Sequence, residues 1–96
     1  MLKYLNDIKE EDLLEIRNLA SMFFSIQEIS EMLEIDFSII EDQMSIKDSP
    51  IYKAYKGGNY DGQIMVRTGI IKMAKAGSTP AQAMAMDLIK KLILTE

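Results

Sequence analysis

Six basic side chains in the second half of the chain carry the clearest chemical signal. Lys53 and Lys56 are three residues apart, as are Lys72 and Lys75, so each pair shares one face of a helix. Lysine and arginine bind nucleic acids chiefly by neutralising phosphates. We therefore predict weak, repeated DNA contacts through Lys47, Lys53, Lys56, Arg67, Lys72 and Lys75. The alternative is that these side chains solubilise helices or pair with the acidic half of a neighbouring subunit.

A second candidate site lies within SIQEISEMLEIDFSIIEDQM, whose spacing is typical of two short helices joined by a tight turn. Ser25 followed by Glu28 is a capping-box pattern, which marks the start of a helix. The layout is that of a helix-turn-helix, a unit that places its second helix in a DNA groove. In the second helix, Ser38 and Gln43 have side chains able to read base edges.

The outer face of this predicted helix-turn-helix is acidic. Glu41 and Asp42 lie on its second helix, and Glu28, Glu31 and Glu34 precede them, with no Lys or Arg among residues 25–44. Carboxylates repel the phosphates that supply most DNA affinity. Groove binding through the second helix therefore competes with another interpretation, a stable three-helix module used for folding or protein contact. The acidity favours the latter.

The charge is split between the two halves of the 96-residue chain. Residues 1–44 hold three basic and eleven acidic side chains, a net charge of −8. Residues 45–96 hold eight basic and four acidic side chains, a net charge of +4, and the sum is the formal charge of −4. Such a split indicates complementary packing within or between subunits, or a basic surface for a polyanion. Solvated faces of opposite sign are the simplest explanation.

No arrangement of residues favours catalysis. Cysteine and histidine are absent, which removes thiolate sites and the commonest general base and metal ligand. The cluster Gly57–Gly62 is not followed by the Gly-Lys-Ser/Thr of a phosphate-binding loop, and its Asp61 is one carboxylate where calcium needs several. A bend, or a close approach of helices in an oligomer, explains the glycines better. We predict no enzymatic activity, no cofactor and no metal site.

Helical periodicity predicts an all-α fold in two parts. The first part, residues 1–47, is a three-helix module whose last two helices form the helix-turn-helix. Asn6 or Asp7 can open the first helix, which continues to about Phe24. Asp36 can cap the third helix. We expect the second and third helices at residues 25–33 and 37–44.

The second part, residues 48–96, is predicted to be an antiparallel hairpin of a long and a shorter helix. Ser49 before Pro50 marks the start of the long helix. Propensity favours a loop at Gly57–Asn59, because each glycine costs about 1 kcal/mol in a helix. Gly77 is well placed to end the long helix.

The last helix has a clear start signal and an excess of apolar residues. Thr79 is the expected N-cap, with Pro80 at the first position and Gln82 as the reciprocal capping partner. Its apolar arc, like that of the long helix, is wider than one packed neighbour needs. A second subunit best supplies the additional face. We therefore predict a homo-oligomer with an interface that includes Ile64, Ile71, Met73, Met84, Leu88 and Leu92.

Nothing in the sequence predicts a membrane or secreted protein. No apolar run reaches the roughly 18 residues of a membrane span. The opening MLKYLNDIKEEDLLE lacks the apolar core of a secretion signal. We expect no membrane partner and a cytoplasmic location.

The layout of the chain resembles that of the small terminase subunits of tailed bacteriophages. The resemblance extends from about Leu13 to Leu92 and rests on layout and apolar spacing. In the first part the matching residues are Ile29, Leu33, Ile35, Ile39 and Ile40. In the second part they are Pro50, Tyr52, Ala54, Tyr55 and Gly58, then Ala74, Ala76, Gly77 and Ala81 through Leu92. Glu34 departs from the pattern, since many helix-turn-helices have glycine there.

The resemblance implies a non-enzymatic viral DNA-packaging protein. Proteins of that family assemble into rings through their central helices and recognise the packaging site on double-stranded DNA. They regulate the large terminase subunit, which hydrolyses ATP and cuts DNA. For this chain the resemblance implies the same partners, and the cytoplasm of the host cell as the location.

Two other functions stay open. One is a small helix-turn-helix transcriptional regulator, which would bind a short palindrome through Ser38 and Gln43. The other is an acidic protein–protein adaptor without DNA binding, which contacts a basic partner through the N-terminal half. Binding to DNA at low salt, where phosphate contacts are strongest, separates the adaptor from both DNA-binding alternatives.

Overall fold

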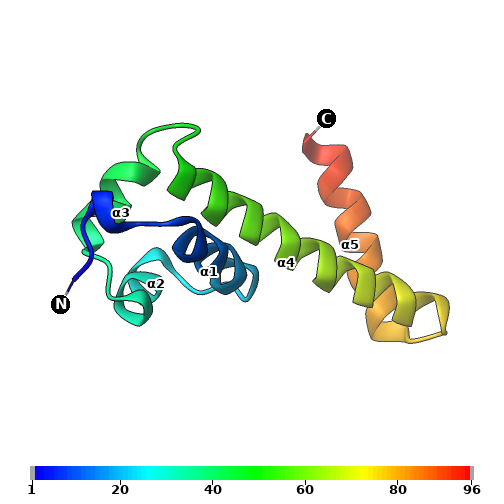
Figure 1. Ribbon diagram of the computed structural model, residues 1–96. Coiled ribbons are helices and arrows are strands. Elements are labelled where there is room, and N and C mark those ends of the chain that lie inside the picture. Colours follow the sequence, from blue (N-terminus) through cyan, green and yellow to red (C-terminus); the bar gives the residue numbers. More distant parts are fainter. Residues whose placement is uncertain (1, 96) are drawn as a thin grey trace. The chain divides into compact units, whose positions relative to one another are not determined.

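The computed structural model describes residues 2–95, and this part of the chain is all-helical, as predicted (Figure 1). A short 3-10 helix at Leu5–Asp7 precedes five α-helices. They are α1 (Glu10–Ser21), α2 (Ile26–Leu33), α3 (Phe37–Met44), α4 (Pro50–Lys75) and α5 (Thr79–Thr95). Among the described helices, none combines the length and the apolar character that crossing a membrane requires.

The chain divides into two compact units, unit 1 at Met1–Gly62 and unit 2 at Gln63–Glu96. The predicted boundary falls between residues 47 and 48, whereas this division lies inside α4. The difference arises because the first half of α4 packs with α1. Ile51 is buried in the core of unit 1, and Gly62 lies against the backbone of α1.

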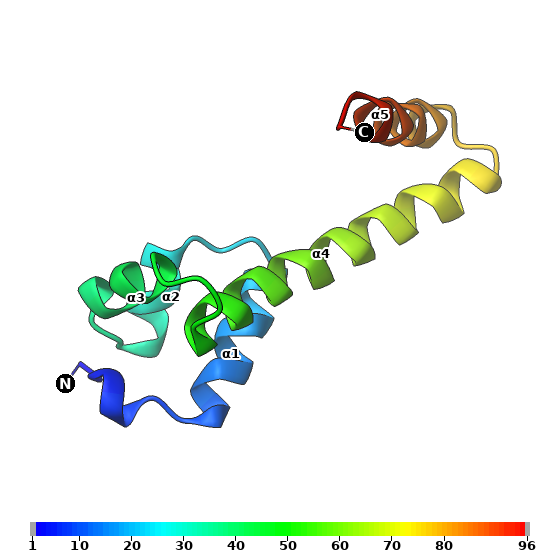
Figure 2. The same ribbon diagram turned by 90° about the horizontal axis from the view of Figure 1, so that it is seen from above.

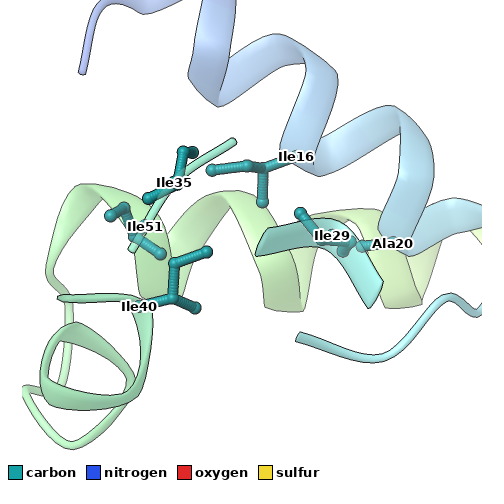
Figure 3. Packing of buried hydrophobic residues seen from close by; sticks show 6 residues of the cluster. All are labelled: Ile16, Ala20, Ile29, Ile35, Ile40 and Ile51. Carbon is teal, nitrogen blue, oxygen red and sulfur yellow. The ribbon is translucent and has the colours of Figure 1, made fainter. Parts of the chain in front are cut away.

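Unit 1 is built around one apolar core to which all of its helices contribute (Figure 3). Its buried members are Ile16 and Ala20 of α1, Ile29 of α2, Ile35 of the following turn, Ile40 of α3 and Ile51 of α4. Each is at most 2% exposed, and burying one such isoleucine contributes about 1.5–3 kcal/mol. Of the other residues in the same predicted apolar set, Leu33 is half-buried and packs against this core, and Ile39 is half-buried. Packing around this core holds α1, α2 and α3 together.

Hydrogen bonds at three helix starts confirm the predicted caps. Ser25 Oγ accepts the Glu28 N–H at 3.1 Å, and the Glu28 carboxylate accepts the Ser25 N–H at 3.0 Å. Asp36 accepts the N–H two residues further on at 2.9 Å. Ser49 accepts the N–H three residues further on at 3.1 Å, directly before α4 begins at Pro50. These bonds satisfy amides that the helices leave free.

The start of α1 differs from the prediction. The helix begins at Glu10 with Lys9 as the N-cap residue. Asp12 accepts the Lys9 N–H at 2.9 Å and so closes the first turn. Asn6 and Asp7, the predicted openers, belong to the 3-10 helix instead. Tertiary packing decides the start of α1, because Asp12 also binds the segment before the helix.

That segment, residues 2–9 (the N-terminal arm), fastens α1 to the turn between α2 and α3. The Lys3 N–H donates to the Glu34 carbonyl at 2.7 Å, and the Asp36 N–H donates to the Lys3 carbonyl at 3.3 Å. Lys3 Nζ also donates to the Asp12 carboxylate at 2.6 Å. Asp12 is 5% exposed, and this hydrogen bond, followed by the one from the Lys9 N–H, lowers its pKa.

The helix α4 is continuous through Gly57–Gly62, so the loop that propensity alone favours there does not form (Figure 2). A Cβ at Gly58 would lie 2.6 Å from the Cβ of Ala20, and one at Gly62 would lie 2.9 Å from the Phe23 ring. Both would also clash with backbone carbonyls of α1. The glycines permit close packing of α1 and α4 within one subunit, and that packing outweighs their propensity cost of about 1 kcal/mol each.

In unit 2, α4 ends at Lys75, and Gly77 terminates the helix as predicted. Gly77 has a φ of +102°, a left-handed conformation that suits glycine. Its N–H donates to the Ala74 carbonyl, and the Ser78 N–H donates to the Met73 carbonyl, each at 3.1 Å. This pair of bonds is the Schellman arrangement that satisfies the last carbonyls of a helix.

The cap of α5 lies one residue earlier than predicted. Ser78 Oγ accepts the Ala81 N–H at 3.4 Å, so Ser78 rather than Thr79 is the capping residue. The Gln82 amide donates to the Ala74 carbonyl at 3.2 Å instead of bonding back to the cap. Serine is preferred over threonine as an N-cap residue, which agrees with Ser78 in this position.

Candidate nucleic-acid and subunit interfaces

Three of the six predicted DNA-contacting residues lie in unit 1, and all three are exposed. Lys47 lies between α3 and α4, and Lys53 and Lys56 lie near the start of α4. Lys56 Nζ is 5.9 Å from the centroid of the Tyr52 ring, a cation–π contact that orients the lysine. Because Ile51 takes the buried face of this segment, the lysines stay accessible to a polyanion.

The other three predicted basic residues lie in unit 2 and are also exposed. Arg67, Lys72 and Lys75 all belong to the second half of α4. Lys72 and Lys75 occupy its last turn, where positive charge offsets the negative end of the helix dipole. Together with Thr68 and Ile71 they line a shallow hollow. The sequence-based prediction did not include Lys90 and Lys91, two further basic residues that are exposed on α5.

Ser38 and Gln43, the predicted base-reading residues, lie in different environments. Ser38 is exposed, but its hydroxyl donates to the Asp36 carboxylate at 2.7 Å as part of the cap of α3. That bond and the one from the Ser38 N–H lower the pKa of Asp36. Gln43 is half-buried and lines a hollow with Leu5 of the N-terminal arm and Pro50.

The outer surface of α2 and α3 is acidic, in agreement with its composition. The exposed acidic side chains there are Glu28, Glu31, Glu34, Glu41 and Asp42. Residues 25–44 contain no basic side chain to balance them. Glu34 adopts a left-handed conformation, with φ 55° and ψ 44°, at the turn position where glycine is common. This surface suits a basic protein better than DNA.

The predicted interface residues are mostly exposed. Ile64, Ile71, Met73, Met84 and Leu92 are exposed, and Leu88 is half-buried. Sequence reasoning missed several equally exposed apolar residues of unit 2, namely Met65, Val66, Met86, Ile89, Ile93 and Leu94. All of these except Leu94 belong to the apolar arcs that helical periodicity indicates on the two helices, although the predicted interface did not include them. Within the described part of unit 2, only Ala81 is buried.

Unit 2 also holds an apolar groove between the second half of α4 and α5. Its lining residues are Arg67, Ile71, Ala85, Leu88, Ile89 and Leu92. Arg67 is the one charged residue among them, and it forms no ion pair with any described residue. The groove therefore combines an apolar floor with one accessible positive charge.

The ion pair between Arg17 and Asp61 gives the glycine-rich segment a structural role. Arg17 donates two hydrogen bonds to the Asp61 carboxylate, at 2.7 and 3.1 Å, and so connects α1 to α4 within unit 1. The hydrogen bond raises the pKa of Arg17 and lowers that of Asp61. Asp61 thus belongs to the packing of α1 on α4.

The described residues present charged and apolar surfaces that are accessible to a binding partner. Residues 2–95 contain no cluster of three or more acidic side chains that could hold a metal ion. The accessible charges include the basic residues of α4 and the acidic surface of α2 and α3, and eleven large apolar side chains are exposed in unit 2. No protein-family model, no curated protein and no solved structure matches this chain.

Proposed function

We propose that this protein is a non-enzymatic, homo-oligomeric DNA-packaging protein of the small terminase subunit type. In this proposal α2 and α3 form a helix-turn-helix module, and the second half of α4 with α5 forms a helical hairpin that assembles subunits. The assembly, in the form of a ring, contacts double-stranded DNA and regulates a large packaging subunit. The layout of residues 13–92 supports the family, and the surface of unit 2 supports the assembly.

The exposed apolar residues of unit 2 carry the proposal. Eleven large apolar side chains between residues 63 and 95 are exposed. Large exposed apolar patches on a protein surface mark sites of interaction, and three of these side chains, Ile71, Ile89 and Leu92, line one apolar groove. Burial at about 25 cal/mol per Å² makes their coverage strongly favourable. A second copy of the same surface is the partner that the chain itself provides.

The basic residues of α4 support DNA contact by the assembly. A single subunit offers the lysines at 47, 53, 56, 72 and 75 and Arg67, all exposed, and each phosphate contact adds a modest, salt-dependent increment. Repetition around an oligomer multiplies such weak contacts, because the second and later contacts are effectively intramolecular. This arrangement assigns DNA contact to α4 and leaves the acidic surface of α2 and α3 away from phosphates.

Light scattering coupled to size exclusion tests the assembly. We expect an oligomer at micromolar concentration, and a shift towards monomer when Met73→Lys and Leu92→Lys are combined. Ile46→Lys is the matched control, because Ile46 is an equally exposed apolar residue of unit 1. A monomeric wild-type protein at these concentrations would overturn the proposed assembly.

Fluorescence anisotropy with labelled double-stranded DNA tests the DNA contact. We expect binding that weakens steeply as salt rises, and at least tenfold weaker binding when Lys53→Glu and Lys56→Glu are combined. Lys90→Glu with Lys91→Glu makes the same charge change on α5 and should have a smaller effect. No binding to DNA at low salt would remove DNA from the proposal.

A second candidate function has one specific observation in its favour. The exposed acidic surface of α2 and α3, with no basic residue in residues 25–44, fits an adaptor that binds a basic protein. An assembled protein that binds no DNA at low salt, and that loses a basic partner on Glu31→Lys with Glu41→Lys, would favour the adaptor.

A further inference from the structure

The apolar groove of unit 2 has the shape and charge to accept an apolar side chain with a carboxylate beside it. Its walls include Ile71, Ile89 and Leu92, which are 45%, 50% and 57% exposed. Arg67 brings a guanidinium to this apolar surface and is unpaired in the described part of the chain. A desolvated arginine at an interface is favourable when it meets a carboxylate.

The outer face of α1 has the complementary pattern. Leu14 is 67% exposed, more than any other aliphatic side chain among the exposed residues of unit 1. Glu10 and Glu11 lie one helical turn before it, and Glu15 lies next to it. All three glutamates are exposed, and none forms an ion pair with a described residue. Arg17, one turn after Leu14, is neutralised by its ion pair with Asp61. The chain therefore contains an exposed leucine with unpaired glutamates before and beside it.

We propose that Leu14 of one copy inserts into the groove of a second copy, with Glu11 and Glu15 facing the partner's Arg67. The inference rests on the proposed assembly and specifies one of its contacts. The occupant is a second copy because the charges are complementary, with unit 1 rich in carboxylates and the groove basic. The contact joins two different surfaces, so it is heterologous and generates a ring or an open chain of subunits.

This contact divides by role the six predicted DNA-contacting basic residues, which are Lys47 before α4 and five residues within α4. Arg67 serves the subunit interface, because it lies at the apolar groove. The five lysines at 47, 53, 56, 72 and 75 lie outside that lining and remain accessible to DNA. Substitution of Arg67 should therefore weaken assembly more than it weakens the contact of a single subunit with DNA.

Cross-linking between copies tests the contact directly, because the chain has no cysteine. Leu14→Cys and Ile71→Cys variants are mixed and treated with a short bis-maleimide, with a mass tag on one variant. We expect mixed dimers at least tenfold above the yield from either variant alone. Met32→Cys, an exposed apolar residue of α2 among glutamates, replaces Leu14→Cys as the control and should give little product.

Two cross-linking results would overturn the proposal. One is efficient cross-linking of either variant with itself, which indicates an isologous contact. The other is a yield from Met32→Cys equal to that from Leu14→Cys, which indicates that α2 occupies the groove. An assembled wild-type protein without the mixed product would reject this contact and leave the proposed function standing. A monomeric wild-type protein would reject both.

Charge reversal provides an independent test. Arg67→Glu should raise the dissociation constant of the assembly at least tenfold, because it places like charges in contact. Glu11→Arg combined with Glu15→Arg should do the same, and mixing the two variants should restore mixed dimers. Glu41→Arg, which reverses a charge on α3 of unit 1, should leave assembly unchanged. Unchanged assembly by Arg67→Glu contradicts the proposal.

Discussion

The two units of this protein use their apolar residues in opposite ways. In unit 1, isoleucines from four helices and a turn meet in one core, and each is nearly inaccessible to water. In unit 2, Ala81 alone is buried among the described residues, and eleven large apolar side chains are exposed. The hydrophobic effect favours burial whichever molecule supplies the cover. Unit 1 therefore completes its burial within one chain, whereas we infer that unit 2 completes it against a second molecule.

The largest expected change in the free energy of unfolding comes from replacing a core isoleucine of unit 1, in contrast to an exposed isoleucine of unit 2. Ile29→Ala should lower the free energy of unfolding by about 2–5 kcal/mol at any protein concentration, because it leaves a cavity. Ile64→Ala should cost the monomer less than about 0.5 kcal/mol and should act mainly by weakening association. Urea denaturation followed by circular dichroism at two protein concentrations measures both. Equal costs at low concentration would show that one chain buries Ile64.

Two glycines of α4 allow a buried position of unit 1 and an exposed position of unit 2 to be compared within a single helix. Gly58→Ala should destabilise the protein by about 3 kcal/mol, because its Cβ meets the backbone of α1, which cannot move aside. Gly69→Ala should stabilise it by about 0.5–1 kcal/mol, since nothing lies within 4 Å of a Cβ there. Thermal unfolding of the two variants tests this difference in sign. A neutral Gly58→Ala would contradict the close packing of α1 on α4.

Asp12 should make the stability of unit 1 dependent on pH. Its pKa is lowered in the folded state, so its contribution is complete above its unfolded pKa of about 3.9 and is lost as pH falls through the lower folded pKa. Asp12→Ala should cost about 1–3 kcal/mol at pH 7. Urea denaturation of variant and wild type at pH 7 and at pH 2.5 should show this difference shrinking in acid. Asp42→Ala, which removes an exposed carboxylate, should show no such change.

The smallest expected effect concerns the turn between α2 and α3. Glu34→Gly should stabilise unit 1 by about 0.5–1 kcal/mol, because glycine adopts the left-handed conformation without strain, while it also loses more entropy on folding. Glu31→Gly makes the same change inside α2 and should destabilise by about 1 kcal/mol. Denaturation midpoints compare the two. Loss of stability in Glu34→Gly would indicate that the glutamate side chain itself holds the turn.

Local hydrogen bonds made much of the fold predictable. The capping box of Ser25 with Glu28, the cap at Asp36, the start of α4 at Pro50 and the end of α4 at Gly77 all involve residues within a few positions of one another. Such interactions are encoded in neighbouring residues, so spacing reveals them. The predicted DNA and interface residues are largely exposed, and their roles stay predictions.

Apart from the cap of α5, which is a local choice between Ser78 and Thr79, the differences from expectation fall where distant residues meet. The loop that propensity favours in α4 does not form, because Gly58 and Gly62 pack against α1, residues that are distant in the sequence. The predicted start of α1 failed because Asp12 bonds Lys3, which also joins the turn at Glu34. Neither contact leaves a periodic signal in the sequence.

By itself, the sequence determined the all-helical class, four helix termini and the excess of apolar residues in the second half of the chain, because composition and short-range spacing encode these features. Tertiary structure alone decided that α4 is continuous, that Asp61 binds Arg17, and that unit 1 extends to Gly62. The physical reason is that close packing against α1 outweighs the local cost of glycine, and only the folded chain brings those partners together.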